Sequence, residues 1–320
     1  MPPRYLNRRR TIGVSRRRKF TSSRYRRSSR APRRTYRKPI RRMSRRGMIN
    51  TLSKKKRDTS MSAAASDETN PGPEAPFTGL NVRVSAATGT NTLLPGVHSF
   101  LYVPTERFLA PNNAYYVAQR TASNPFYKGI SETYTFLPND SSVWWHRRIV
   151  FATKRRYEQE IEQLANGGYF APGTSSTQNT RRKLRDMSMS DGLDGFEAIQ
   201  ANLIADVFRG VFNVDWFDSM RAALDKTRIT VLSDRLTTIK SQNDSPAPRI
   251  VKHYTPINKT VVYADEESGQ TMQPSQFSVE SKTGLGNIYI LDLVECPVPT
   301  DTTTTTVSFG STQTVYWHEK

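Results

Sequence analysis

After residue 57 the chain is a series of short runs rich in β-branched and aromatic residues, separated by stretches rich in Gly, Pro, Asn and Asp. Such runs are typical of β-strands, and the residues between them are typical of turns. The linkers are long and uneven, which favours a Greek-key sandwich over a meander of tight hairpins. The pattern predicts seven clear strands, at residues 97–103, 129–137, 143–152, 227–232, 256–263, 287–295 and 305–317, and a short edge strand at 57–63 makes eight.

Two segments have the helical period instead. Residues 154–165 place apolar side chains on one face and end before Asn166 and Gly167, a common helix stop. Residues 194–209 repeat apolar residues three and four apart, begin at the capping residue Asp194, and stop at Gly210. Both lie between two predicted strands, so residues 153–226 are predicted to form one long helical insertion.

Charge divides the chain into two parts. The whole chain has 48 Lys+Arg and 28 Asp+Glu, a net charge of +20. Residues 1–57 contain 24 Lys+Arg and no acidic residue, so the remainder has 48 − 24 = 24 basic residues against 28 acidic ones, a net charge of −4. The first part has too few apolar residues to offset the entropy of folding and is predicted to be disordered without a polyanion. We therefore predict a disordered arm at 1–57 and one folded domain at 58–320.

The side chains of the arm are typical of a segment that binds nucleic acid. Guanidinium groups bind phosphates in pairs of hydrogen bonds and stack on bases, and the scattered aromatics Tyr5, Phe20, Tyr25 and Tyr36 favour single strands over duplex. The alternative is a solvated basic tail that serves only nuclear import, but import is also expected as a second use of a DNA-binding arm. The import signal is placed at Lys54, Lys55, Lys56 and Arg57. The predicted DNA-binding residues are Arg8, Arg9, Arg10, Arg16, Arg17, Arg18, Lys19, Arg24, Arg26, Arg27, Arg30, Arg33, Arg34, Arg37, Lys38, Arg41, Arg42, Arg45 and Arg46.

The sequence carries no pattern typical of an enzyme, a cofactor site or a metal site. The single cysteine, Cys296, excludes an internal disulfide and a cysteine-rich zinc cluster, and the four histidines lie far apart. Neither a phosphate-binding loop nor a nucleophile elbow is present. No signal peptide or membrane span is expected, because the N-terminal segment has no apolar core and no apolar stretch of about 18 residues exists.

Two short motifs have open interpretations. Asp265, Glu266 and Glu267 form either a solvated turn, or a contact with a neighbouring subunit or a divalent cation. Trp144 and Trp145 should point to opposite sides of a strand, so one indole faces the core. The other is covered either by a loop of the same chain or by another subunit, which would indicate oligomerisation.

Four segments, in order along nearly the whole chain, resemble the capsid proteins of genomoviruses, small circular single-stranded DNA viruses associated mainly with fungi. They are KKKRDTSMSA (54–63), GISETYTFLPNDSSVWWHRRIVF (129–151), HYTPINKTVVYADEESG (253–269) and SKTGLGNIYILDLVE (281–295). The resemblance implies a single eight-stranded jelly roll of two four-stranded sheets, a T=1 shell of about sixty copies, and an arm that points inward to the genome. The chain is more distantly similar to geminivirus capsid proteins. Those often carry a Cys/His zinc-finger-like element, which a chain with one cysteine lacks, so metal binding is not carried over.

These observations predict a structural capsid subunit that packages circular single-stranded DNA by charge neutralisation. Its expected partners are the DNA genome, other copies of itself and host nuclear import receptors, and its expected locations are the virion and the host nucleus. One alternative is a non-viral chromosomal or RNA-binding protein with a basic tail, working as a monomer or dimer. Another is a hydrolase or nuclease with a basic substrate arm, which would need a carboxylate or histidine cluster at strand ends.

Overall fold

The computed structural model describes residues 44–64, 79–86, 94–110, 118–157, 170–171, 181–188, 194–241 and 245–320. One compact unit spans Arg45–Lys320. The arm up to residue 43 lies outside the described residues, so its disorder stays a prediction. The folded unit begins with helix α1, Arg45–Leu52, which leads directly into strand β1, Lys54–Ala64.

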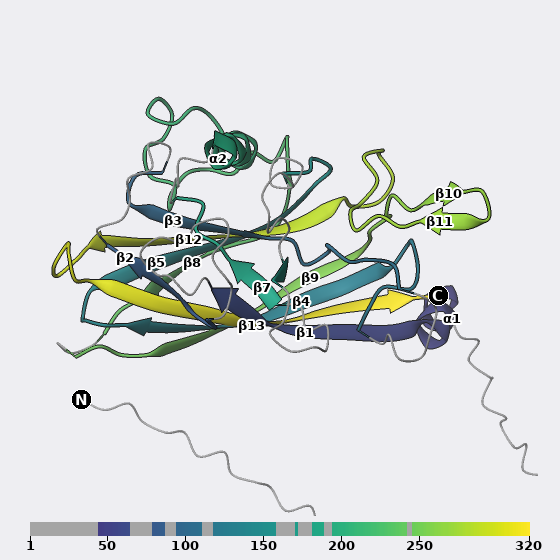
Figure 1. Ribbon diagram of the computed structural model, residues 1–320, viewed down its shortest axis with the longest axis horizontal. Coiled ribbons are helices and arrows are strands. Elements are labelled where there is room, and N and C mark those ends of the chain that lie inside the picture. Colours follow the sequence, from purple (N-terminus) through teal and green to yellow (C-terminus); the bar gives the residue numbers. More distant parts are fainter. Residues whose placement is uncertain are drawn as a thin grey trace, which may run out of the picture. The chain divides into compact units, whose positions relative to one another are not determined.

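Most strands lie in two layered sheets (Figure 1). The first sheet has seven strands in the order β6-β7-β1-β13-β4-β9, with β2 also paired to β13, and the second has four in the order β3-β12-β5-β8. A separate hairpin joins β10, Glu266–Ser268, to β11, Thr271–Gln273. The remaining strands are β2 (Val82–Ser85), β3 (Val97–Tyr102), β4 (Phe126–Pro138), β5 (Val143–Thr153), β6 (Phe170–Ala171), β7 (Arg181–Leu184), β8 (Thr230–Ile239), β9 (Arg249–Thr260), β12 (Asn287–Val298) and β13 (Thr306–Glu319).

The chain passes repeatedly between the two sheets. β1, β4, β9 and β13 lie in the first sheet, whereas β3, β5, β8 and β12 lie in the second. Within each sheet, strands distant in sequence become neighbours, such as β1 with β13 and β3 with β12, and these pairs are antiparallel. This is the arrangement of a jelly-roll-like sandwich, which confirms the all-β, antiparallel part of the predicted fold class but not its count of eight strands. The second sheet has the predicted four strands, but the first is larger because β2, β6 and β7 add to it.

Two details of the predicted strands were wrong. The strand predicted at the sheet edge is β1, which lies inside the sheet, paired with β13 on one side and with β7 over Ser62–Ala64 on the other. The strand predicted from Pro256 onward is β9, which begins earlier, at Arg249. A proline inside it is tolerated because β9 is an edge strand and Pro256 lies beside a bulge at Gly129.

The insertion between β5 and β8 is not only helical. Its helix α2, Asp194–Val207, confirms the second predicted helix, and its strands β6 and β7 extend the first sheet. The other predicted helix does not start at Lys154. Residues 154–157 are a loop, where the Lys154 ammonium donates to the carbonyl of Thr283, and 158–165 lie outside the described residues.

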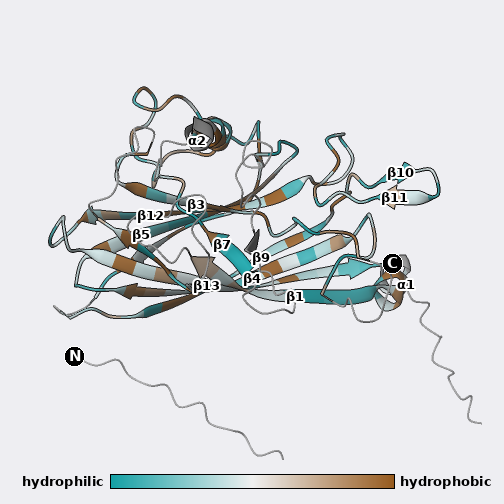
Figure 2. Cartoon of the chain, viewed as in Figure 1, coloured by the Kyte–Doolittle hydropathy of each residue, from teal (hydrophilic) through white to brown (hydrophobic). Residues whose placement is uncertain are grey.

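Hydrophobic residues fill the space between the sheets and a second space between the second sheet and the insertion. Along β4 and β13, apolar and polar residues alternate as expected for strands with one buried face (Figure 2). The second sheet is covered on both sides, so the first eight residues of β12 are all buried. Ile199 and Leu203 of α2 belong to the same buried cluster as Phe151 and Leu293 of this sheet. None of the described helices is long and apolar enough to cross a membrane.

Candidate functional sites

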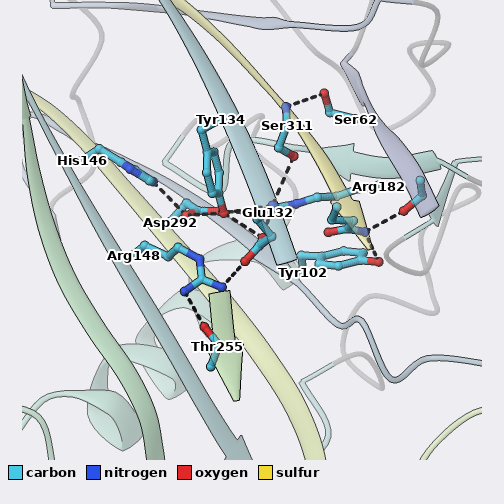
Figure 3. A network of polar contacts seen from close by, with 12 residues as sticks. Ser62, Tyr102, Glu132, Tyr134, His146, Arg148, Arg182, Thr255, Asp292 and Ser311 are labelled. Atoms are coloured by element: carbon cyan, nitrogen blue, oxygen red, sulfur yellow. Dashed lines mark hydrogen bonds and ion pairs between the residues drawn. The ribbon is translucent and has the colours of Figure 1, made fainter. Parts of the chain in front are cut away.

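A network of charged side chains lies fully buried between the two sheets (Figure 3). Arg182 of β7 is central to it, because its guanidinium contacts both carboxylates, Glu132 at 3.2 Å and Asp292. Arg148 of β5 pairs with the other oxygen of Glu132, and the Nε2 atom of His146 donates to Asp292 at 2.8 Å. The ion-pair side chains have no exposed surface, so the network joins β4, β5, β7 and β12 without contact with solvent.

The charges of this network are balanced and fixed. Burial by itself would raise the pKa of the Asp292 carboxyl, but Arg182 and the hydrogen bond from His146 hold that pKa far below its usual value. Burial raises the pKa of Tyr134 well above its usual value, and the neighbouring Asp292 and Glu132 raise it further. The tyrosine therefore stays neutral and donates to Glu132 at 2.9 Å. We interpret the role of the network as structural: it holds the two sheets together. It is closed to solvent, and its charges are paired within the chain.

The sequence analysis did not find this network. Its members are separated by up to 158 residues, as in the contact between Tyr134 and Asp292. The only available signal was the presence of charged residues at apolar-facing positions of predicted strands.

The residues predicted to bind DNA are almost all outside the described part of the chain. Arg45 and Arg46 are the exceptions, and they form the first turn of α1. DNA binding by the arm therefore stays a prediction.

The four residues of the predicted import signal belong to the folded unit and not to the arm, because they form the start of β1. Lys54, Lys55 and Arg57 are exposed, but Lys56 is buried. Its ammonium lies 2.8 Å from the Glu319 carboxylate and donates to the hydroxyl of Thr121 at 2.7 Å. In the folded chain this ammonium is occupied and has no exposed surface, so an import receptor would read only the other three residues.

The three acidic residues 265–267 do not form one group in the structure. Asp265 accepts two hydrogen bonds from the Arg120 guanidinium, at 2.5 and 2.9 Å, and both side chains are fully buried. Burial would raise the pKa of Asp265, but these bonds from Arg120 lower it below its usual value. Glu266 and Glu267 are exposed on β10. Asp265 is thus used within the chain, and no group of three potential metal ligands occurs in the described residues.

The second tryptophan of the pair is covered by its own chain. Trp144 is fully buried between the sheets, as one of the two was predicted to be. Trp145 faces the insertion, is partly buried there, and has the Arg221 guanidinium 5.6 Å from its ring centroid. This packing favours the first interpretation, a loop of the same chain over the indole, so oligomerisation stays a prediction that Trp145 does not support.

The first sheet separates its charges between its two sides. Three acidic residues occur in its strands, Asp58, Glu132 and Glu319, and all three point inward to ion-pair partners. Asp58, for example, lies 2.8 Å from Arg107. Because side chains alternate along a strand, the neighbouring basic residues point outward. The outward side thus carries basic residues and no acidic residue from these strands.

We call this side the basic face and define it by Lys55, Arg57, Arg83, Lys128 and Lys252, which are exposed on β1, β2, β4 and β9. Two of these charges lie close to a histidine between them. Burial lowers the pKa of His318, between β1 and β4 on β13, and the charges of Lys55 and Lys128 lower it further. A row of positive charge therefore crosses three neighbouring strands.

Two tyrosines lie in the middle of the basic face. Tyr316 is paired with Gly129 across β13 and β4, and Tyr254 lies on the adjacent strand β9. A side chain at Gly129 would collide with the Tyr254 hydroxyl, 2.5 Å from the Cβ position, so the Tyr254 ring lies across β4 at this glycine. Tyr254 remains 49% exposed, which leaves much of its ring open to a ligand.

A carboxylate with an unusual pKa lies away from this face, at the end of β12. Burial raises the pKa of Glu295 to about 7, and the nearby Asp218 of the insertion contributes, while Arg221 opposes the shift. One carboxylate oxygen of Glu295 is buried without a hydrogen-bond partner.

We expect Glu295→Gln to stabilise the protein at pH 8 and to have little effect at pH 4.5. The folded state binds the Glu295 proton more tightly than the unfolded state, so the parent loses stability as pH rises from about 4.5 to 7. The variant lacks this loss, so its advantage should grow over that window to roughly 1–3 kcal/mol after allowance for solvent screening. Thermal melts at several pH values would measure it, with Glu267→Gln on the exposed hairpin as the control. A stability advantage of Glu295→Gln that stays constant with pH would contradict the raised pKa of Glu295.

Comparisons with known proteins do not identify a family. No family model and no curated protein matches the chain. Among solved structures, VP1 of Trichodysplasia spinulosa-associated polyomavirus in complex with sialylated glycooligomers aligns at 8% identity over 83% of this chain and 95% of that chain, with a TM-score of 0.18. The same protein in complex with GM1 oligosaccharide aligns at 9% identity over 83% and 94% of the two chains, with a TM-score of 0.17. Similarity this low carries no argument about function.

Proposed function

We propose that this protein is a viral capsid subunit that assembles with copies of itself and packages single-stranded DNA. The observation that carries the proposal is the division of charge between a jelly-roll-like sandwich and the polycationic segment that precedes its first helix, α1. Residues 1–44 contain 18 Lys+Arg and no acidic residue, so they can neutralise phosphates. A sandwich with such a tail is suited to forming a shell around a polyanion.

Exposed apolar residues support assembly. Val214 and Phe217 of the insertion are 79% and 80% exposed, and Leu52 of α1 is 84% exposed. Large apolar side chains at this exposure favour contact with another protein surface. The finer parts of the proposal are an eight-stranded core, a T=1 shell of about sixty copies, a circular genome and entry into the host nucleus. These parts rest on the resemblance to genomovirus capsid proteins.

We expect the purified full-length protein to form uniform particles, on the order of 20 nm across, that protect single-stranded DNA from nuclease. Negative-stain electron microscopy and extraction of DNA after nuclease treatment would test both parts. A protein that stays monomeric or dimeric with DNA present, at low and physiological salt, would instead favour a non-viral chromosomal or RNA-binding protein.

A further inference from the structure

We propose that the basic face is a second binding surface for single-stranded DNA, separate from the arm. This inference rests on the proposed function, because it assigns part of the DNA contact to the folded unit. The ligand is a flexible single strand whose phosphates contact the lysine and arginine side chains and whose bases stack on Tyr254 and Tyr316.

The charge arrangement is the first argument. All the acidic residues in the strands of the first sheet are turned inward and paired, so Lys55, Lys128 and Lys252 face outward with no acidic neighbour on the same strands. Lys55 and Lys128 lie near enough to His318 to lower its pKa, after the larger effect of burial, so the positive potential is continuous across β1, β13 and β4. The binding of a polyanion is most favourable where the basic side chains are not already paired with acidic ones.

The surface between the charges is the second argument. Three neighbouring strands place hydroxyl side chains there at paired positions, and small hydroxyl groups donate hydrogen bonds to phosphates without blocking a backbone. The Thr59 and Thr314 hydroxyls, for example, are 2.9 Å apart across β1 and β13. The outward hydroxyl residues of β1, β4 and β13 are Thr59, Ser131, Thr133, Thr135, Ser308, Thr312 and Thr314.

The two tyrosines favour single strands over duplex. Bases stack on an aromatic ring only when they are unpaired, and such stacking does not depend on base identity. Tyr254 and Tyr316 lie on either side of Gly129, the one position between them without a side chain. Because a larger residue there would displace the Tyr254 ring, the glycine keeps an aromatic platform flat against the sheet.

Photo-cross-linking of the full-length protein would test the surface directly. The probe is a single strand containing bromouracil, irradiated after binding, with cross-linked peptides identified by mass spectrometry. We expect cross-links in peptides containing Tyr254 or Tyr316 besides those in the arm. Cross-links confined to residues 1–44 would overturn the inference but leave the proposed function intact, whereas no binding of single strands at all would contradict the proposed function itself.

A salt titration with a matched control measures the contribution of the charges. The face variant is Lys55→Gln, Lys128→Gln and Lys252→Gln, and the control is Lys226→Gln, Lys240→Gln and Lys282→Gln, exposed lysines outside the strands of the first sheet. The slope of log K against log salt changes by roughly 0.7 for each lost phosphate contact on a single strand. The slope of the face variant should therefore be shallower than that of the parent by about 2, while the control should keep the parent slope. Equal slopes in all three full-length proteins, each with the parent circular dichroism spectrum, would show that the face does not bind DNA.

Discussion

A chain shortened to residues 45–320 should fold and assemble but lose most of its packaged DNA. The deletion removes 18 Lys+Arg and leaves the compact unit, which begins at Arg45, intact. Without those charges few phosphates are neutralised, and the remaining affinity should fall steeply with salt. Nuclease-protected DNA per particle would measure the loss. Truncated particles that hold parental amounts of DNA would contradict the role of the arm.

A slightly longer deletion, to residue 57, should have a different and more severe result. It also removes α1 and the first four residues of β1, where Lys56 is paired with Glu319. Glu319 would then be left buried without its cation, which typically costs about 3–5 kcal/mol, and the end of β13 would lose one of its two partner strands. We expect this protein to be destabilised or insoluble. Soluble yield and thermal melts of the two truncations side by side would show whether the domain begins at residue 45 or at 58.

Arg182→Met should lower the free energy of unfolding by about 3–5 kcal/mol, the largest effect expected from one substitution in this chain. Arg182 is fully buried and neutralises Glu132 and Asp292 together. After its loss, Glu132 keeps Arg148, whereas Asp292 keeps the Tyr134 hydroxyl and His146 but no permanent cation. Two buried carboxylates would then share one permanent cation, and urea unfolding followed by tryptophan fluorescence would measure the cost.

A double-mutant cycle separates the loss of charge balance from the loss of packing. Adding Asp292→Asn to Arg182→Met removes the carboxylate left unpaired, so the double variant should be more stable than the sum of the two single effects indicates. Arg181→Met is the matched control, because Arg181 is the neighbouring residue on β7 and lies outside the ion-pair network. It should change stability by no more than about 0.5 kcal/mol. Additive effects of Arg182→Met and Asp292→Asn would mean that the charges are not coupled.

The sequence alone determined the division of the chain and most of the long strands. Runs of β-branched and aromatic residues between turn residues are sufficient to indicate strands, so β3, β4, β5, β12 and β13 were found within a few residues of their ends. Helix α2 was found for the same reason, from its period of three and four. The strong charge of the arm is likewise a property of composition. Short strands such as β6 and β7 were missed because two to four residues carry too little periodic signal.

Only the tertiary structure decided which charged residues are paired and which are exposed. Lys55 and Lys56 are adjacent and chemically identical, yet one points outward and the other forms a buried ion pair with Glu319. Asp265 likewise meets Arg120, 145 residues away, and does not act with Glu266. The register between strands sets these outcomes, and a shift of one residue would reverse the direction of every side chain. Register depends on contacts between segments distant in sequence, so no local pattern contains it.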